Sequence, residues 1–450
     1  MAKIQKPTEF GVLLKHYGLE IFELAHTYKA VDDKGRYLHW DEFRRYPAPG
    51  VNKEAAWAAI KMSRACGSKT LELRSECNSP FFLYITDFCD AVIHGVESVT
   101  SRLGGAAASS PQYRDNTKYL VDSLMMEEAI SSAQLEGAAT TRKVAKDMLA
   151  KERTPQSDDE RMILNNYHLM KHAKYNKDES LSVALICEFH GIATAGIDEE
   201  NVHPGHIRAD DDIFVGGAGD EVVHQPPKAL LLPARLEALC QFVNDRHDGQ
   251  GGRHFIHPLV KAIILHFMVG YEHPFRDGNG RTARCLFYWF MLKSGYWPFE
   301  YISISTLLKE APMQYGRSYI HTETDAFDLT YFVIYQLRVI ERATHEFMQY
   351  FEDKKRDAVE LTNWLDTLNL KDGLNYRQGH FLKKVLHHPG RIFTPKELTH
   401  DYDISENTAR KDLEKLVSMK VLFQVQEGKG FLYVARDDAQ ANLEKLTSAG

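Results

Sequence analysis

"HPFRDGNGRTAR", residues 273–284, joins two segments with a helical hydrophobic pattern and gathers charged side chains around small residues. Gly278, Asn279 and Gly280 tolerate unusual backbone angles, so their N–H groups can turn inward as an anion-binding nest. The helical pattern resumes at Arg281, which puts this nest at a helix N-terminus, where free N–H groups favour phosphate. The stretch therefore predicts a phosphate site within a helical fold.

The side chains around the nest have the chemistry of group transfer. Arg281 and Arg284 are three residues apart, so both guanidinium groups can fork onto phosphate oxygens. Asp277 can hold a Mg²⁺ ion that bridges phosphates. His273 is the side chain whose ordinary pKa suits proton transfer near neutrality. These are the parts of a phosphoryl- or nucleotidyl-transfer site.

Two other interpretations of the glycine-rich turn were weighed. The string "GNGRTA" (278–283) fits a loose dinucleotide fingerprint, and Glu300 lies about 20 residues on, where a ribose-binding acid belongs. That fingerprint requires a preceding strand, whereas residues 259–272 have a long helical pattern. A simple surface turn needs one glycine and none of the flanking charged residues. The group-transfer interpretation is therefore favoured.

The stretch resembles the Fic motif, HxFx(D/E)GNGRxxR. Every fixed position is met, by His273, Phe275, Asp277, Gly278, Asn279, Gly280, Arg281 and Arg284. Residues 257–275 are similar to the helix that leads into the active-site loop of this family, and residues 204–227 to its flap, a β-hairpin over the site. The resemblance covers most of residues 120–350 and, more weakly, the N-terminal region.

The resemblance implies an all-α core that transfers AMP from Mg-ATP to a Tyr, Thr or Ser hydroxyl of a target protein. It implies that His273 is the general base and that Asp277 holds Mg²⁺ on the phosphates. It further implies that residues 278–280 cradle the phosphates, with Arg281 helping and Arg284 clamping the γ-phosphate. The flap would pair with an extended target segment as an added strand.

A second motif lies upstream in "SSAQLEGAATT" (131–141). Taken alone it is a helix end, with Gly137 at the position after the C-cap. Beside the Fic motif, Ser132, Glu136 and Gly137 resemble the inhibitory motif of the family, (S/T)xxxE(G/N), on a helix predicted at 124–137. A glutamate paired with Arg284 would withdraw the guanidinium from the γ-phosphate. Some family members instead use this glutamate to remove AMP, and the sequence leaves both directions open.

Residues 394–435 predict a C-terminal module. Thr394, Pro395 and Glu397 form a helix-start signature, and Ser405 caps a second helix. Two strand-like runs follow, so the region resembles a winged helix-turn-helix. Between residues 376 and 436 there are 11 Lys/Arg and 7 Asp/Glu, a balance of +4 in a chain of −7. DNA binding, dimerisation and docking of a protein substrate all stay open for this module.

The composition bounds the rest of the interpretation. A length of 450 residues predicts two or three domains. We expect an aromatic-rich N-terminal extension (1–110) that ends at a small-residue linker (104–112), a Fic core (111–366) and a winged helix (367–450). The six cysteines are scattered, no signal peptide precedes them, and no apolar run reaches the length of a membrane span, which together predict a cytoplasmic protein.

The sequence thus predicts a mainly α protein: a Fic-type helical core with a β-hairpin flap, plus a C-terminal winged helix-turn-helix. Its predicted activity is autoinhibited protein adenylylation, with self-modification included. The alternatives are AMP removal, transfer from another nucleotide donor, and a nucleotide-sensing regulator that binds DNA or protein. ATP and a target protein are the expected partners, a homodimer is a further one, and no membrane partner is expected.

Overall fold

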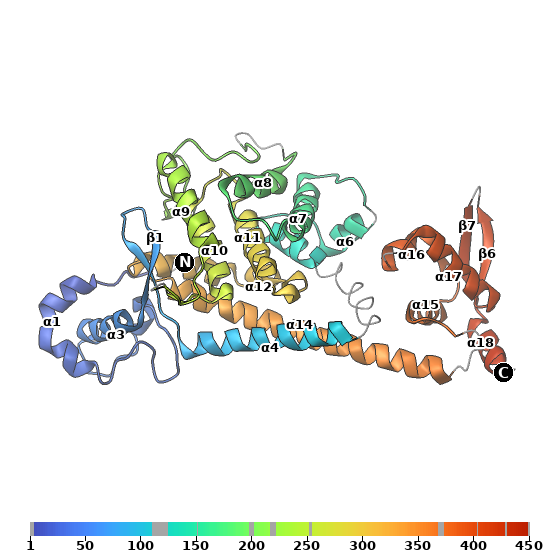
Figure 1. Ribbon diagram of the computed structural model, residues 1–450, viewed down its shortest axis with the longest axis horizontal. Helices are drawn as coiled ribbons and strands as arrows, with labels where there is room; N and C mark the ends of the chain where they lie inside the picture. The colour runs from blue at the N-terminus through green and yellow to red at the C-terminus, as the bar shows by residue number, and fades with distance from the viewer. Residues whose placement is uncertain are drawn as a thin grey trace. The chain divides into compact units, whose positions relative to one another are not determined.

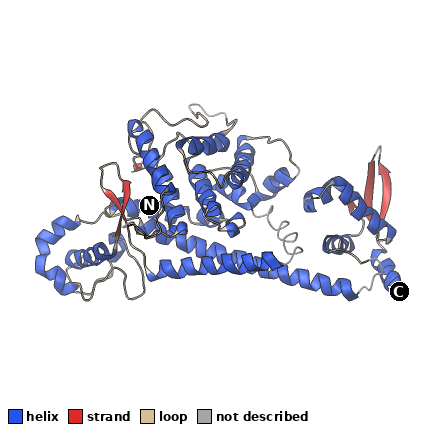
Figure 2. Ribbon diagram, in the orientation of Figure 1, coloured by secondary structure: helices blue, strands red, loops and turns tan. Residues whose placement is uncertain are grey.

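The chain is mainly helical, as predicted (Figure 2). The computed structural model describes residues 4–109, 125–150, 152–197, 202–216, 222–251, 254–367, 373–402, 404–427 and 430–448. Of the described residues, 4–109, 125–149 and 154–344 form one compact unit, and residues from His345 onward form the bulk of a second. Among the described residues, no helix combines the length and the apolar character that a membrane crossing requires.

The first unit is built from helices with two small hairpins (Figure 1). Its α-helices, apart from the helical residues 125–135, are α1 (Phe10–Leu24), α2 (Trp40–Phe43), α3 (Lys53–Gly67), α4 (Asp87–Ser109), α6 (Arg142–Ala150), α7 (Asp158–Tyr175), α8 (Val183–Thr194), α9 (Leu232–Asn244), α10 (Pro258–Glu272), α11 (Asn279–Lys293), α12 (Ile304–Glu310), α13 (Pro312–Thr324) and the start of α14 (Thr330–Thr367). Short 3₁₀ turns are η1 (Ala229–Leu231) and η2 (Trp297–Glu300). The antiparallel hairpins are β1 (Lys69–Arg74) with β2 (Pro80–Leu83), and β3 (Val215–Gly216) with β4 (Val222–His224).

The predicted N-terminal extension packs into this same unit. Arg235 of α9 joins the two regions: its guanidinium binds the buried Glu272 carboxylate at 2.6 Å and donates to the carbonyl of Arg74 at 2.7 Å. The predicted linker at 104–112 is helical as far as Ser109, where α4 ends, and residues 110–112 lie outside the described ones. The boundary between the units falls at 344–345, within α14. The division of the chain into three parts stays a prediction.

Helices α10 and α11 form the centre of the first unit. Nearly every residue of both helices is buried, and α11 buries Asn279, Arg281 and Arg284 along with its apolar residues. His257 caps α10, accepting from the N–H of Leu259, and Pro258 occupies the first turn, where its missing N–H costs nothing. The loop between these two buried helices therefore has fixed ends.

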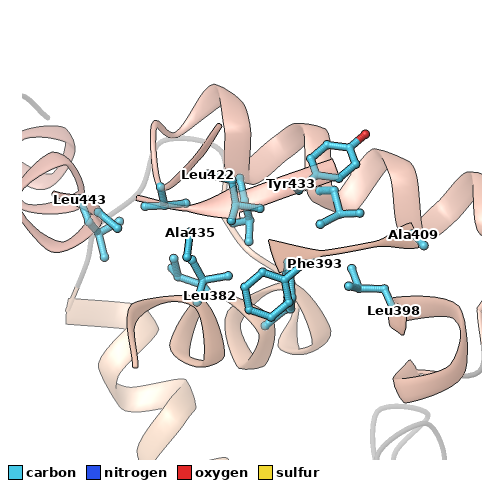
Figure 3. Packing of buried hydrophobic residues seen from close by; sticks show 14 of the residues in the cluster. Leu382, Phe393, Leu398, Ala409, Leu422, Tyr433, Ala435 and Leu443 are labelled. Carbon is cyan, nitrogen blue, oxygen red and sulfur yellow. The ribbon is translucent and has the colours of Figure 1, made fainter. Parts of the chain in front are cut away.

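The second unit packs helices against one face of a three-stranded sheet. Its helices are α15 (Tyr376–Leu386), α16 (Pro395–Tyr402), α17 (Glu406–Ser418) and α18 (Ala439–Ser448), and its antiparallel strands β5 (Ile392–Phe393), β6 (Leu422–Glu427) and β7 (Gly430–Ala435) have the order β5-β7-β6. Figure 3 shows Leu382, Phe393 and Leu422 meeting in the apolar core. The predicted caps are present, since Thr394 and Ser405 accept from the N–H groups of Glu397 and Thr408. This arrangement is consistent with the winged helix, which stays a prediction.

Candidate active site

The loop between α10 and α11 is a tight turn with special backbone angles at both ends. His273 ends α10 in the left-handed region (φ 45°, ψ 57°), and its N–H donates to the carbonyl of Val269 at 3.1 Å. Gly278 begins α11 with φ +75°, and a Cβ there would lie 2.8 Å from Thr194 Cγ2. Only glycine meets both the angle and the space. The predicted base and the predicted nest therefore lie on one rigid loop.

Asn279 and Phe275 brace this loop from inside. The Asn279 side chain accepts from the N–H of Phe275 at 2.9 Å and donates to its carbonyl at 2.7 Å. Both side chains are buried, with Phe275 fully enclosed. Because the Asn279 amide is committed to the loop, its predicted phosphate role falls to its backbone N–H.

His190 of α8 supports the same loop, and the sequence reasoning did not single it out. Its ring stacks on Phe275 with the centroids 3.7 Å apart. Nδ1 accepts from the N–H of Gly205, so the proton lies on Nε2, which donates to the carbonyl of Asp277 at 2.9 Å. Burial lowers the pKa of His190 to about 4, so the ring stays neutral.

The two motif arginines have different environments. Arg281 is buried, donates to the carbonyl of Ala193 at 2.7 Å and pairs with Asp277 at 2.5 Å. Arg281 thus holds the loop to α8 and orients Asp277, and its predicted role at the phosphates stays a prediction. Arg284 is also buried, and its partners come from residues 132–136 instead.

Arg284, Ser132 and Glu136 form the contact that the upstream motif predicts. Arg284 Nε donates to Ser132 Oγ at 3.0 Å, and Nη2 contacts the Ser132 carbonyl at 3.1 Å and Glu136 Oε1 at 2.8 Å. A Cβ on Gly280 would lie only 2.3 Å from Glu136 Oε1. The carboxylate therefore lies directly against the loop on which the phosphate nest was predicted.

The helical residues 125–135 hold this carboxylate in place. Glu128, near their start, is 3% exposed and accepts from Ser303 Oγ at 2.7 Å and from the N–H of Ser305 at 3.1 Å, at the N-terminus of α12. Gly137 ends the segment with φ +104°, as its predicted position after the helix requires. Residue 124, the predicted first residue of the helix, lies outside the described part.

The surroundings of His273 keep its imidazole neutral. Burial, together with the positive charges of His224 and Arg208, lowers its pKa to about 4, against the opposing effects of the Gly270 carbonyl and of Glu136. The ring is therefore able to accept a proton at neutral pH.

The predicted flap is present as the β3–β4 hairpin, and its two arms are fastened beside His273. Arg208 on the first arm donates from Nε to the carbonyl of His273 at 2.9 Å and from Nη2 to the carbonyl of Pro227 on the second arm. His224 of β4 donates to the carbonyl of Tyr271 and to the Glu323 carboxylate, both at 2.8 Å. Burial opposes a charge on His224, but Glu323 outweighs it and raises the pKa.

Residues 180–291 match the Fic/DOC family. This Fic segment contains the loop, α8, the flap and α10–α11, whereas Ser132 and Glu136 lie before it. The match therefore covers the proposed base and phosphate site, and leaves the upstream contact to be judged from its own geometry.

Proteins similar to part of this chain carry the name protein adenylyltransferase Fic. The protein of Drosophila virilis is 28% identical over 143 residues, which are 31% of this chain and 27% of that protein. The protein of Drosophila melanogaster is 27% identical over 31% of this chain and 26% of its own length. The matched region thus spans about a quarter of these relatives.

Two solved structures also resemble this chain in part. A Fic family protein from Desulfovibrio desulfuricans G20 is 17% identical, covers 78% of this chain and 97% of its own, and has a TM-score of 0.49. Fic-1 (residues 134–508) from C. elegans is 16% identical over 77% of this chain and 89% of its own, also with a TM-score of 0.49.

The sequence reasoning missed His190, Arg208, His224 and Glu323. Each contacts the loop or the flap from a segment with no local motif. Their only signal in the sequence is a polar side chain within an otherwise apolar or flap-like stretch, and that signal is common to many residues with no such role.

Proposed function

We propose that the protein transfers AMP from Mg-ATP to a hydroxyl of a target protein, and that Glu136 holds this activity in check. The observation that carries the proposal is the Glu136–Arg284 ion pair against Gly280, on the same loop as a neutral His273. A site built for transfer, with its anion position taken by an internal carboxylate, is what an autoinhibited transferase requires.

The chemistry follows from the loop. His273 accepts the proton of the incoming hydroxyl, whose oxygen bonds to the α-phosphorus as the bond from that phosphorus to the bridging oxygen breaks. AMP is then esterified to the target and pyrophosphate leaves. The N–H groups at the start of α11 and the Arg284 guanidinium, once Glu136 has turned away, bind the phosphate oxygens.

A single carboxylate is suited to the magnesium ion of Mg-ATP. Asp277 is 41% exposed beside the nest, and the described residues contain no cluster of three or more His, Cys, Asp or Glu side chains that could hold a metal. Mg²⁺ keeps several waters and is commonly bound through one or two carboxylates plus phosphates, so Asp277 fits this role. When bound, the ion neutralises charge on the phosphates.

The decisive experiment follows the label from ATP into protein. Wild type, Glu136→Gly and Glu136→Gly/His273→Ala are incubated with Mg²⁺ and with ATP labelled at either the α- or the γ-phosphate, with the chain itself as acceptor. We expect α-label alone, strongest in Glu136→Gly and absent without His273. A matched control is Glu136→Gly/His387→Ala, which removes an exposed histidine of the second unit and should label fully.

The other outcomes separate the alternatives. Label from the γ-phosphate means that the site acts as a kinase and contradicts the proposal. If no variant labels, parallel incubations with other nucleoside triphosphates and with pre-adenylylated protein test a different donor and AMP removal. If these also fail while ATP still binds, the nucleotide-sensing regulator is the better interpretation.

The second unit has a separate proposed role. Its exposed Arg410 and Lys411 favour contact with a polyanion, but Arg410 is already paired with Glu406. We expect weak, salt-dependent DNA binding at most, and a role in docking protein. Anisotropy titrations of the full chain with duplex DNA at low and physiological salt test this, with Arg410→Ala/Lys411→Ala as the variant. Tight binding that survives physiological salt would contradict it.

A further inference from the structure

Arg276 stands inside the catalytic loop at a place that the Fic motif leaves unspecified. It lies between Phe275, which is buried, and Asp277, which orients toward Arg281. Its own side chain takes part in neither interaction. The Arg276 guanidinium reaches outward and is 26% exposed.

The partners of Arg276 are two aspartates of the first flap arm. Nη2 donates to Asp210 Oδ2 at 2.7 Å and to Asp212 Oδ1 at 3.1 Å, and Nη1 approaches Asp212 Oδ2 at 3.4 Å. The intervening Asp211 instead accepts from the N–H of Ala229 at 2.6 Å and from Arg208. Asp210 and Asp212 thus face the loop, whereas Asp211 binds Arg208 and the start of η1, so the three aspartates are more than a solvated acidic patch.

The two arginines that hold the flap differ in kind. Arg208 is buried and binds backbone carbonyls on the loop and on both arms, so it is part of the packing. Arg276 binds side chains that are 63% and 62% exposed, so its contacts can open without unpacking the core. It is therefore suited to adjusting the flap rather than to building it.

We propose that Arg276 is a positioning residue that clasps the first flap arm through Asp210 and Asp212 and so sets the flap for an extended segment of the protein substrate. The inference rests on the proposed function and names a residue that acts on the target polypeptide rather than on ATP. It adds a determinant of substrate binding to the loop that carries the base.

The test compares the two sides of the clasp. Four variants are made in the Glu136→Gly background: Arg276→Ala, Arg276→Lys, Asp210→Asn/Asp212→Asn, and the combination of Arg276→Ala with both asparagines. Initial rates of α-label transfer are measured against the concentration of a His273→Ala chain, which serves as acceptor, and separately against ATP. Hydrogen exchange of the flap amides is followed in the same proteins.

We expect Arg276→Ala to raise KM for the acceptor by about threefold to tenfold, because exposed ion pairs contribute modestly. The kcat and the KM for ATP should stay close to the parent. Asp210→Asn/Asp212→Asn should match this effect, the combined variant should add nothing further, and Arg276→Lys should recover part of it. Flap amides should exchange faster wherever the clasp is lost.

Two results would contradict the proposal that Arg276 positions the first flap arm. The first is a rise in the KM for ATP with Arg276→Ala but not with the asparagine pair, which would mean that Arg276 contacts the nucleotide directly. The second is unchanged flap exchange in Arg276→Ala. Failure of the proposed function looks different, since the parent Glu136→Gly protein itself would then incorporate no label.

Discussion

Two of the three glutamates in residues 125–136, Glu128 and Glu136, contact the rest of the first unit in opposite ways. Glu128 is 3% exposed and is saturated by the hydroxyl and N–H groups of Ser303 and Ser305. Glu136 has a side chain that is 28% exposed, and its one described ion pair is with Arg284. The first glutamate is buried with its donors, whereas the second reaches the active-site loop from the edge of the helix.

This difference in burial means that the two contacts differ in how easily they can break. Burial with several hydrogen bonds makes the Glu128 contact costly to break, because each donor would lose its partner in a dry site. A partly exposed carboxylate with one ion pair can rotate into water at far lower cost. The Glu136 side chain can therefore turn away from Arg284 while the helix stays docked.

The largest expected effect, on the rate of AMP transfer, comes from removing the Glu136–Arg284 ion pair. Glu136→Gly should raise AMP transfer by roughly a hundredfold, because a misplaced α-phosphate costs about that factor. Rates of α-label incorporation at saturating Mg-ATP measure it. An equal or lower rate in Glu136→Gly would show that the ion pair does not restrain the site.

Removing the buried contact of Glu128 with Ser303 and Ser305 should lower the stability of the fold. Glu128→Ala leaves the buried donors of Ser303 and Ser305 unpaired and should lower the free energy of unfolding by about 2–4 kcal/mol. The matched control is Glu127→Ala, whose partners Arg142 and Lys146 are exposed and whose loss should cost less than about 1 kcal/mol. Thermal melts of both variants measure this difference. Equal shifts of the melting temperature in Glu128→Ala and Glu127→Ala would contradict a special structural role of Glu128.

A smaller effect is expected from Ser132, which accepts a hydrogen bond from Arg284 beside the Glu136 pair. Ser132→Ala removes the acceptor of Arg284 Nε and leaves the Glu136 pair and the Ser132 carbonyl in place. We expect a two- to tenfold rise in transfer, in line with about one hydrogen bond. A rise as large as that of Glu136→Gly would instead make the serine the main restraint.

The smallest expected effect is on the pH profile. Burial lowers the pKa of His273 to about 4, so the neutral base is present throughout the range above that value. In Glu136→Gly the opposing effect of the carboxylate is gone, which moves the pKa further down. With Mg²⁺ in excess, kcat/KM should stay flat from about pH 8 to pH 6 and fall only below about pH 5. A half-loss centred near 6.5 would show an unshifted histidine.

Much of the local structure was readable from residue types. His257 and Pro258 begin α10, and Thr394 and Ser405 cap α16 and α17. Gly137 follows the end of the helical residues 125–135. Such helix ends can be predicted because capping depends on neighbours a few residues away. The flap hairpin was also predicted correctly. The small-residue stretch at 104–109 was not, since it continues α4 where a linker was expected.

For the candidate site too, the sequence predicted some features and not others. The sequence by itself determined that a histidine, a carboxylate, two glycines and the two motif arginines lie close together, because twelve consecutive residues carry them all. It also marked Glu136 as the residue to test against Arg284, 148 positions away, through the resemblance to a second motif.

Only the tertiary structure decided how the charges pair. In the folded chain Arg281 pairs with Asp277 and the carbonyl of Ala193, whereas Arg284 pairs with Glu136. The spacing of the two arginines in the sequence does not predict this difference in partners. The tertiary structure also brought Arg276 against the flap, 64 and 66 positions away in the chain. A buried charge needs a partner, and the packing of distant helices decides which groups lie close enough to pair with it. That packing depends on the whole core rather than on neighbours in sequence.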